Sequence, residues 1–90
     1  MSEKHVHATH SEIVKRLNRA GGHLRSIVDM IEAERPCIDI AQQLHAVERA
    51  IASAKRALIH DHVDHCLTDA ANGTNGGSRL EEFRTITKYL

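Results

Sequence analysis

The segment from Cys37 to Ala71 constrains the fold of this chain more than any other feature. It contains no glycine and no proline, so no residue in it interrupts a helix. Its apolar residues recur in alternating steps of four and three, at Ile40, Leu44, Val47, Ile51, Ala54 and Leu58. This heptad pattern predicts one long helix of roughly 30 residues within the range 37–71, about 45 Å from end to end, that packs along its length against other helices.

A shorter helix is predicted over residues 10–34. Its apolar residues recur at three- and four-residue steps, at Ile13, Leu17, Leu24, Ile27, Val28 and Ile31. Thr9 and Glu12 have the spacing of a capping box at its start. Pro36 is typical of the first turn of a following helix, and it disfavours a helical backbone at the residue before it. Residues 1–9 show little periodicity, and we expect them to form a flexible N-terminal arm.

The end of the chain predicts a loop and a third, short helix. Residues 72–77 are rich in Asn and Gly, which break helices. Ser78 and Glu81 have the spacing of a second capping box, in front of a helix over residues 78–90. The 90-residue chain has no Trp, one Tyr and one Phe, so residues 10–90 are expected to form a single all-α domain of three helices.

Three helices of these lengths cannot cover the long heptad face within one chain. Two copies packed antiparallel would bury it in a four-helix bundle. The sequence therefore predicts a three-helix protomer that forms an antiparallel four-helix-bundle dimer.

The second half of the long helix concentrates metal-binding side chains. Residues 60–66 contain three of the eight histidines and one of the two cysteines. His62 and Cys66 are four residues apart, so their side chains lie on one helix face and can share an ion. A single His or Cys is usually solvated or packed, but this pair within a His-rich turn favours a pair of ligands. Imidazole and thiolate together select Zn(II), Cu(I), Ni(II) or Co(II).

The other thiol, Cys37, lies 25 residues before His62. Along one helix that separation is about 37 Å, so the two side chains cannot bind one ion within a single chain. In an antiparallel dimer, Cys37 comes near the far end of the partner's helix, which gives two symmetric sites shared between subunits. The spacing alone is equally consistent with Cys37 as a small packed residue.

Charge and composition narrow the classes of function. The 12 basic and 12 acidic residues balance, so net charge does not indicate a nucleic-acid partner. Residues 13–28 contain no acid, however, and a locally basic stretch can bind phosphates in a salt-sensitive way. The alternative is a solvated helix face. The basic residues in question are Lys15, Arg16, Arg19, Arg25, Arg49, Lys55 and Arg56.

Other classes are disfavoured. No Ser-His-Asp arrangement, phosphate loop or carboxylate pair indicates an enzyme. No apolar run of about 18 residues indicates a membrane span, and the first ten residues lack the apolar stretch of a secretory signal. Two cysteines suit a reducing compartment. We therefore expect a cytoplasmic protein that is not an enzyme.

Taken together, these residues resemble the CsoR/RcnR-like repressors, which sense copper or nickel. The likeness runs from IVKRLNRAGGHLRSIVDMIE through CIDIAQQLHAVERAIASAKRALIHDHVDHCL to the last helix. Its most specific element is Cys37, His62 and Cys66, at spacings of 25 and four residues. The resemblance implies antiparallel dimers paired into a flat homotetramer, with a metal site shared between subunits. It also implies a repressor that binds operator DNA without metal and releases it when metal binds.

The resemblance bears on the identity of the metal as well. Nickel and cobalt sensors of this family add an N-terminal nitrogen, commonly from a His that lies 32 residues before the first Cys, and here that residue is His5. The set His5, Cys37, His62 and Cys66 resembles their arrangement and suits square-planar Ni(II). Ni(II), with Co(II), is therefore favoured as the effector.

Cu(I) is the alternative effector. Copper members of the family tend to have a Tyr before the first Cys, where this chain has Pro36. Glu82, on the other hand, matches the acid that supports the ligands in copper members. His7 and His65 could substitute for one of the imidazole ligands.

Two positions depart from the family pattern. Gly21 stands where the family usually has Arg, and Ser53 stands where family members use an Arg for DNA, although Arg16 matches an arginine that contacts DNA. A cytoplasmic metal-binding resistance protein with weak or no DNA binding is therefore a further alternative. One branch of the family responds to formaldehyde, but it has an acid at the last ligand position, where this chain has Cys66.

Overall fold

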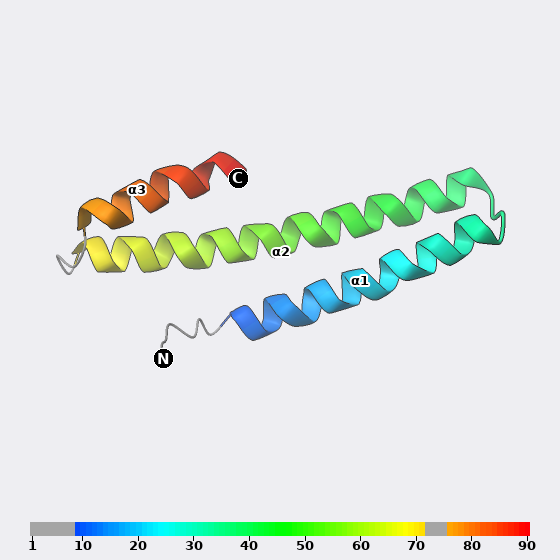
Figure 1. The fold of residues 1–90 in the computed structure, drawn as a ribbon, viewed down its shortest axis with the longest axis horizontal. Helices are drawn as coiled ribbons and strands as arrows, with labels where there is room; N and C mark the ends of the chain where they lie inside the picture. The colour runs from blue at the N-terminus through cyan, green and yellow to red at the C-terminus, as the bar shows by residue number, and fades with distance from the viewer. Residues whose placement is uncertain (1–8, 72–75) are drawn as a thin grey trace.

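The structure is a computed structural model that describes residues 9–71 and 76–90. It contains three α-helices and a final 3₁₀ turn (Figure 1): α1 (His10–Glu32), α2 (Cys37–Ala71), α3 (Gly76–Ile86) and η1 (Thr87–Tyr89). The described ranges contain no strand, so the all-α class with three helices is confirmed. None of the described helices is long and apolar enough to cross a membrane.

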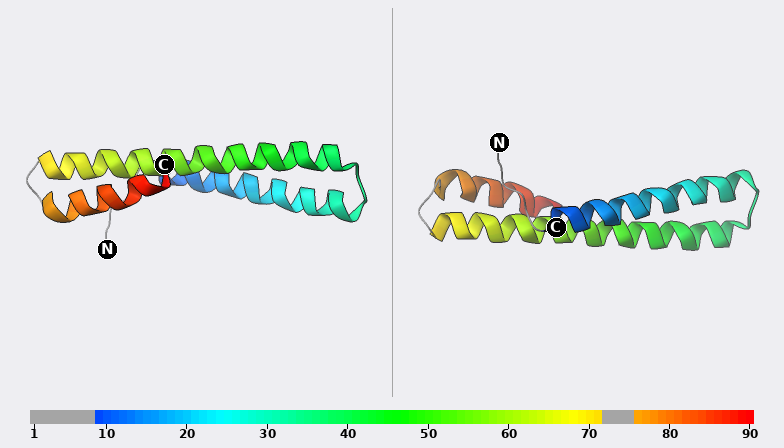
Figure 2. Two further views of the ribbon diagram at one scale, coloured as in Figure 1. Left: turned by 90° about the horizontal axis from the view of Figure 1, so that it is seen from above. Right: turned by 90° about the horizontal axis from the view of Figure 1, so that it is seen from below.

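The long helix α2 is the central helix of the protomer, and the other two helices pack on it. In Figure 1, α1 runs antiparallel to α2 from the Cys37 end, and α3 folds back along the other half of α2. The views of Figure 2 show the same elongated arrangement, whose extents are 57 × 27 × 13 Å. The start of α1 and the end of the chain both reach the stretch of α2 around residues 59–61.

The core of one protomer is small. Among the residues whose side chains the structure describes, the buried ones are Ile13, Ala20, Ile27, Val47, Ala54, Ile59 and Cys66. Three heptad residues on another face of α2, Leu44, Ile51 and Leu58, remain 42%, 42% and 41% exposed. We call these three residues the apolar seam. Large exposed apolar side chains at heptad spacing are expected of a helix that packs against a second chain.

Helix α1 ends at Glu32, two residues before the end of its predicted range, because the backbone turns left-handed at Glu34 (φ 57°). The Glu34 N–H donates to the Ile31 carbonyl, and the Arg35 N–H donates to the Met30 carbonyl, both at 3.0 Å. These two bonds form a Schellman motif, which closes a helix by satisfying its last carbonyls. Glycine is the usual residue at such a position, so the sequence, in which Pro36 indicates an end near residue 34, carried no sign of the left-handed turn at Glu34 itself.

The capping box predicted at the start of α1 does not form. Thr9 precedes α1, but its backbone is already helical (φ −82°, ψ −14°) and its side chain makes no capping hydrogen bond. A capping side chain normally requires an extended backbone at that residue. The Glu12 carboxylate lies instead 3.7 Å from the Lys15 ammonium. At the other end, α3 begins at Gly76, so Ser78 lies within its first turn rather than ahead of it.

Candidate metal centre

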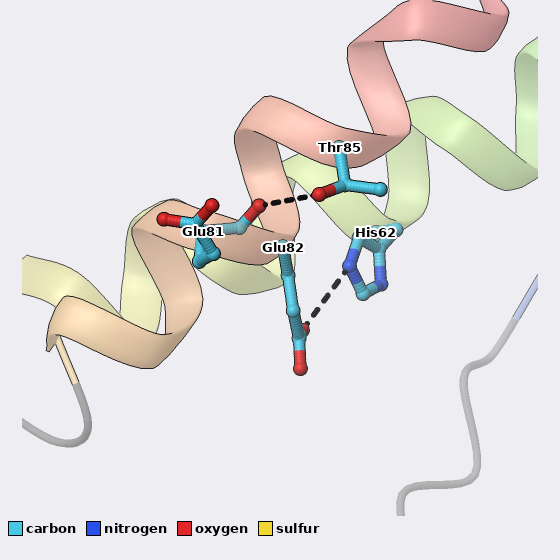
Figure 3. Close-up of polar contacts among 4 residues, drawn as sticks. All are labelled: His62, Glu81, Glu82 and Thr85. Carbon is cyan, nitrogen blue, oxygen red and sulfur yellow. Dashed lines mark hydrogen bonds and ion pairs between the residues drawn. The ribbon is translucent and has the colours of Figure 1, made fainter.

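Three potential metal ligands come together where α3 folds back onto α2. His62 and Cys66 stand one turn apart on α2. Glu82 reaches toward His62 from α3 (Figure 3). One nitrogen, one sulfur and one carboxylate oxygen from these residues all lie within 4.8 Å of one another. The cluster combines imidazole, thiolate and carboxylate donors, a set that suits ions such as Zn(II), Ni(II) and Co(II).

The contact between His62 and Glu82 links the two helices. The His62 Nε2 atom lies 3.4 Å from the Glu82 Oε1 atom. The neighbouring acid, Glu81, points away from His62 in Figure 3, and its backbone carbonyl accepts a hydrogen bond of 3.0 Å from the Thr85 hydroxyl. The rotation of α3 therefore selects Glu82. A carboxylate on one ring nitrogen orients the imidazole and leaves the other nitrogen for an ion.

Burial is graded across the cluster. Cys66 is 2% exposed, whereas the side chains of His62 and Glu82 are 28% and 45% exposed. The thiol therefore forms the base of the cluster, and the carboxylate forms its rim. Further donors have room to approach from the solvent side.

The first residue of helix α1 also lies beside the cluster. The His10 Nε2 atom lies 3.7 Å from the Asp61 Oδ2 atom, one residue before His62. All three helices thus meet at this part of α2. Sequence reasoning did not single out His10, because nothing in the local pattern distinguishes it; only the register of the α1–α2 hairpin places it against Asp61.

The remaining predicted ligands lie elsewhere. Cys37 is exposed at the opposite end of α2, about 37 Å away along the helix axis, so one protomer does not bring it to the cluster. His65 is half-buried on α2 and is not a member of the cluster. His5 and His7, with most of the predicted arm, lie outside the described residues.

The predicted DNA-binding residues all lie on the surface of α1 and α2. Each of them is exposed: Lys15, Arg16, Arg19, Arg25, Arg49, Lys55 and Arg56. Gly21 lies on the same helix as four of them, and a Cβ atom added there would meet no neighbour within 4 Å. Packing within the protomer therefore does not explain why Gly21 lacks a side chain.

Comparison with known proteins places this architecture among metal-dependent regulators. The sequence profile of the family described as "Metal-sensitive transcriptional repressor" matches residues 9–89. The chain is 35% identical over 77 residues to the copper-sensing transcriptional repressor CsoR of Bacillus subtilis. The aligned region covers 86% of this chain and 76% of that protein. It is 39% identical over 70 residues to the copper-sensing transcriptional repressor RicR of Mycobacterium tuberculosis, covering 76% and 73% of the two chains.

A solved structure is similar in fold. The nickel-responsive transcriptional regulator InrS superposes with a TM-score of 0.82 at 30% identity, over 94% of this chain and 96% of that one. The relatives named above thus include both copper-sensing and nickel-responsive proteins.

Proposed function

Since the chain belongs to the metal-sensitive transcriptional repressor family, we propose that it releases operator DNA when Ni(II) or Co(II) binds between two of its subunits. The family resemblance expected from the sequence is confirmed, and the family consists of metal-sensing repressors rather than enzymes. The observation that carries the proposal is the cluster of His62, Cys66 and Glu82. Because the repressor acts on DNA, we place its action in the cytoplasm.

The apolar seam supports a site that is completed across a dimer. In an antiparallel pair of α2 helices, Ile51 can face its own copy while Leu44 faces Leu58 of the partner subunit. This register places Cys37 opposite position 65 of the partner subunit, within one turn of both the imidazole and the buried thiol. The dimer would therefore hold two equivalent metal sites, each with donors from both chains. Pairing of two such dimers gives the proposed flat tetramer.

The ligand set of the proposal is His5, Cys37, His62 and Cys66. His10 lies against Asp61, and a chain of five residues reaches up to about 17 Å, so His5 is within covalent reach of the cluster. Two thiolates and two imidazoles suit Ni(II). When bound, the ion would link the two subunits and the N-terminal segment. His7 and His65 are the substitutes for His5.

The two thiols and the Glu82 carboxylate would have different roles in metal binding. Both thiols must lose their protons to act as ligands, so binding releases protons. Glu82 would hold one nitrogen of His62 and thereby orient the ring. The Cu(I) alternative needs only the three donors Cys37, His62 and Cys66, and it is supported by the copper-sensing relatives.

DNA binding would depend on the exposed basic residues of α1 and α2. Their charges can replace counterions on the DNA backbone, so the affinity should fall steeply with salt. A coupling of about 1–3 kcal/mol between metal and DNA would lower the DNA affinity by about 5- to 150-fold. Gly21 and Ser53 favour the second candidate function, a metal-binding resistance protein that binds DNA weakly or not at all.

A titration of DNA binding tests the proposal directly. The apo protein is titrated into a fluorescent duplex from upstream of its own gene, with and without Ni(II), Co(II) or Cu(I). We expect tight binding that only the effector metal weakens, and loss of that response in His62→Gln. His45→Gln is the matched control, because His45 is an exposed histidine of α2 outside the cluster. Binding that no metal changes would refute the repressor mechanism, and absence of any DNA binding at low salt would favour the resistance protein.

The absorption spectrum of the Ni(II)-loaded protein tests the ligands. Thiolate charge-transfer bands together with the d–d band of four-coordinate Ni(II) are expected. His5→Ala should abolish the d–d band, whereas its persistence would assign the fourth position to His7 or His65.

A further inference from the structure

The first residue of α1 contacts the long helix directly beside the candidate metal centre. The His10 Nε2 atom on α1 lies 3.7 Å from the Asp61 Oδ2 atom on α2. The next residue of α2 is His62, whose Nε2 atom lies 3.4 Å from the Glu82 Oε1 atom of α3. Successive side chains of a helix point about 100° apart, so adjacent residues can face different neighbours. One peptide bond of α2 therefore separates the contact with α1 from the metal cluster.

The contact between His10 and Asp61 is partly shielded from water and joins two helices. The two side chains are 44% and 22% exposed. A second pair of the same kind lies wholly within α2, where the His45 Nδ1 atom is 3.9 Å from the Glu48 Oε1 atom and the side chains are 71% and 80% exposed. Water and salt screen an exposed pair more strongly. The first pair therefore affects how α1 lies on α2, whereas the second pair affects one helix only.

The start of α1 is the part of that helix at which one contact matters most. The Thr9 side chain makes no capping hydrogen bond, although the Thr9 carbonyl accepts a hydrogen bond of 3.0 Å from the Ile13 N–H. Of the first four helical residues, Ile13 is buried, whereas Ser11 and Glu12 are exposed. A helix end without a side-chain cap opens more easily than the helix interior. The order of this turn therefore depends strongly on Ile13 and His10.

We propose that His10 is a positioning residue that couples the metal cluster to the first turn of α1 through Asp61. A metal ion that fixes the His62 ring also fixes the adjoining backbone, and the Asp61 carboxylate is then held where His10 meets it. Metal binding should therefore order the first turn of α1, and by linkage the ordered turn should strengthen metal binding. The consequence for DNA rests on the proposed repressor function, because the basic residues Lys15 and Arg16 follow within two turns. The ordering itself requires only that the protein binds metal.

Amide hydrogen exchange of the full-length protein, with and without Ni(II), tests the coupling. In the wild type, saturation with Ni(II) should slow the exchange of the amides of residues 13–16 by about fivefold or more. His10→Ala removes the contact and should reduce this protection to less than about twofold. The matched control is His45→Ala, which removes the pair within α2 and should keep the wild-type protection. Circular dichroism verifies that each variant remains helical, and the same comparison is made with Cu(I).

Two further variants separate a specific contact from a general loosening of the helix. His10→Lys keeps a cationic donor opposite Asp61 and should retain most of the protection. Asp61→Ala should lose it, and the double variant His10→Ala/Asp61→Ala should lose no more than either single variant, because the two residues act as one pair. A chelator competition should show Ni(II) affinity about two- to fivefold lower in both single variants.

The outcomes distinguish this coupling from the repressor function. Wild-type protection in His10→Ala would overturn the coupling, as would a wild type that binds Ni(II) without any change in exchange at residues 13–16. A wild type that shows this protection while its DNA affinity ignores every metal would refute the repressor function and support the coupling. A wild type that binds neither ion would overturn both.

Discussion

Replacing Ile51 by Lys should separate assembly from the metal cluster. Ile51 belongs to the apolar seam and, in the register proposed above, faces its own copy at the twofold axis. Its side chain is 42% exposed in one protomer, so the methylene stem of a lysine there can keep the covered contacts while its ammonium group reaches solvent. The cluster of His62, Cys66 and Glu82 is also untouched, since it lies three turns farther along α2.

The expected loss of dimer stability follows from the exposed area of the apolar-seam side chains. Full burial of a Leu or Ile side chain contributes about 1.5–3 kcal/mol. The seam residues retain 42%, 42% and 41% of their exposure, so covering that remainder contributes about 0.6–1.2 kcal/mol for each. Six such side chains in a symmetric dimer contribute about 4–7 kcal/mol. Ile51→Lys removes two of them and brings two ammonium groups together, which costs a further 3 kcal/mol or so at an effective dielectric constant of about 20. The dimer dissociation constant should rise by about three orders of magnitude.

Sedimentation velocity and a metal titration against a chelator are the assays. Ile51→Lys should sediment as a monomer at micromolar concentration, keep its helical circular dichroism, and bind Ni(II) far more weakly, because Cys37 no longer meets the cluster of a partner. The control is Ala46→Lys, which adds the same charge at an exposed position of α2 outside the seam. Should the monomer unfold, Leu58→Ala offers a milder loss of seam area. A dimeric Ile51→Lys variant with wild-type metal affinity would refute the seam as the interface.

Three smaller perturbations test other contacts. Glu82→Gln should weaken Ni(II) binding about 10- to 100-fold by loosening His62; an unchanged affinity in a chelator competition would mean that Glu82 does not orient the ring. His23→Ala should lower the free energy of unfolding by about 1 kcal/mol, because it removes the hydrogen bond to Gln43, and urea denaturation that shows no difference would contradict this. Glu34→Gly should raise the unfolding free energy by about 1 kcal/mol, since glycine adopts the left-handed backbone of Glu34 (φ 57°) without steric cost; a destabilised variant in the same assay would argue against it.

The helices could be predicted because their causes are local. The apolar steps and the absence of Gly and Pro from residue 37 to residue 71 are sufficient for α2. Their ends were harder to predict. The stop after α1 depends on a left-handed backbone at Glu34, a residue that ordinarily avoids it, and the Thr9 hydroxyl does not cap because its backbone is already helical. Cap residues indicate a helix end only when the backbone around them adopts the matching conformation.

Local sequence was likewise enough to pair His62 with Cys66 and to separate both from Cys37, since one straight helix dictates these spacings. Tertiary structure decided the rest. Glu82 was expected only from the family resemblance, and it is the rotation of α3 that brings Glu82 rather than Glu81 to the cluster. Packing of α1 on α2 set His10 against Asp61 and joined His23 to Gln43. Each of these contacts joins different helices, so it depends on how the connecting turns rotate one helix about another. Periodicity reports which face of a helix is apolar, but it carries no information about that rotation.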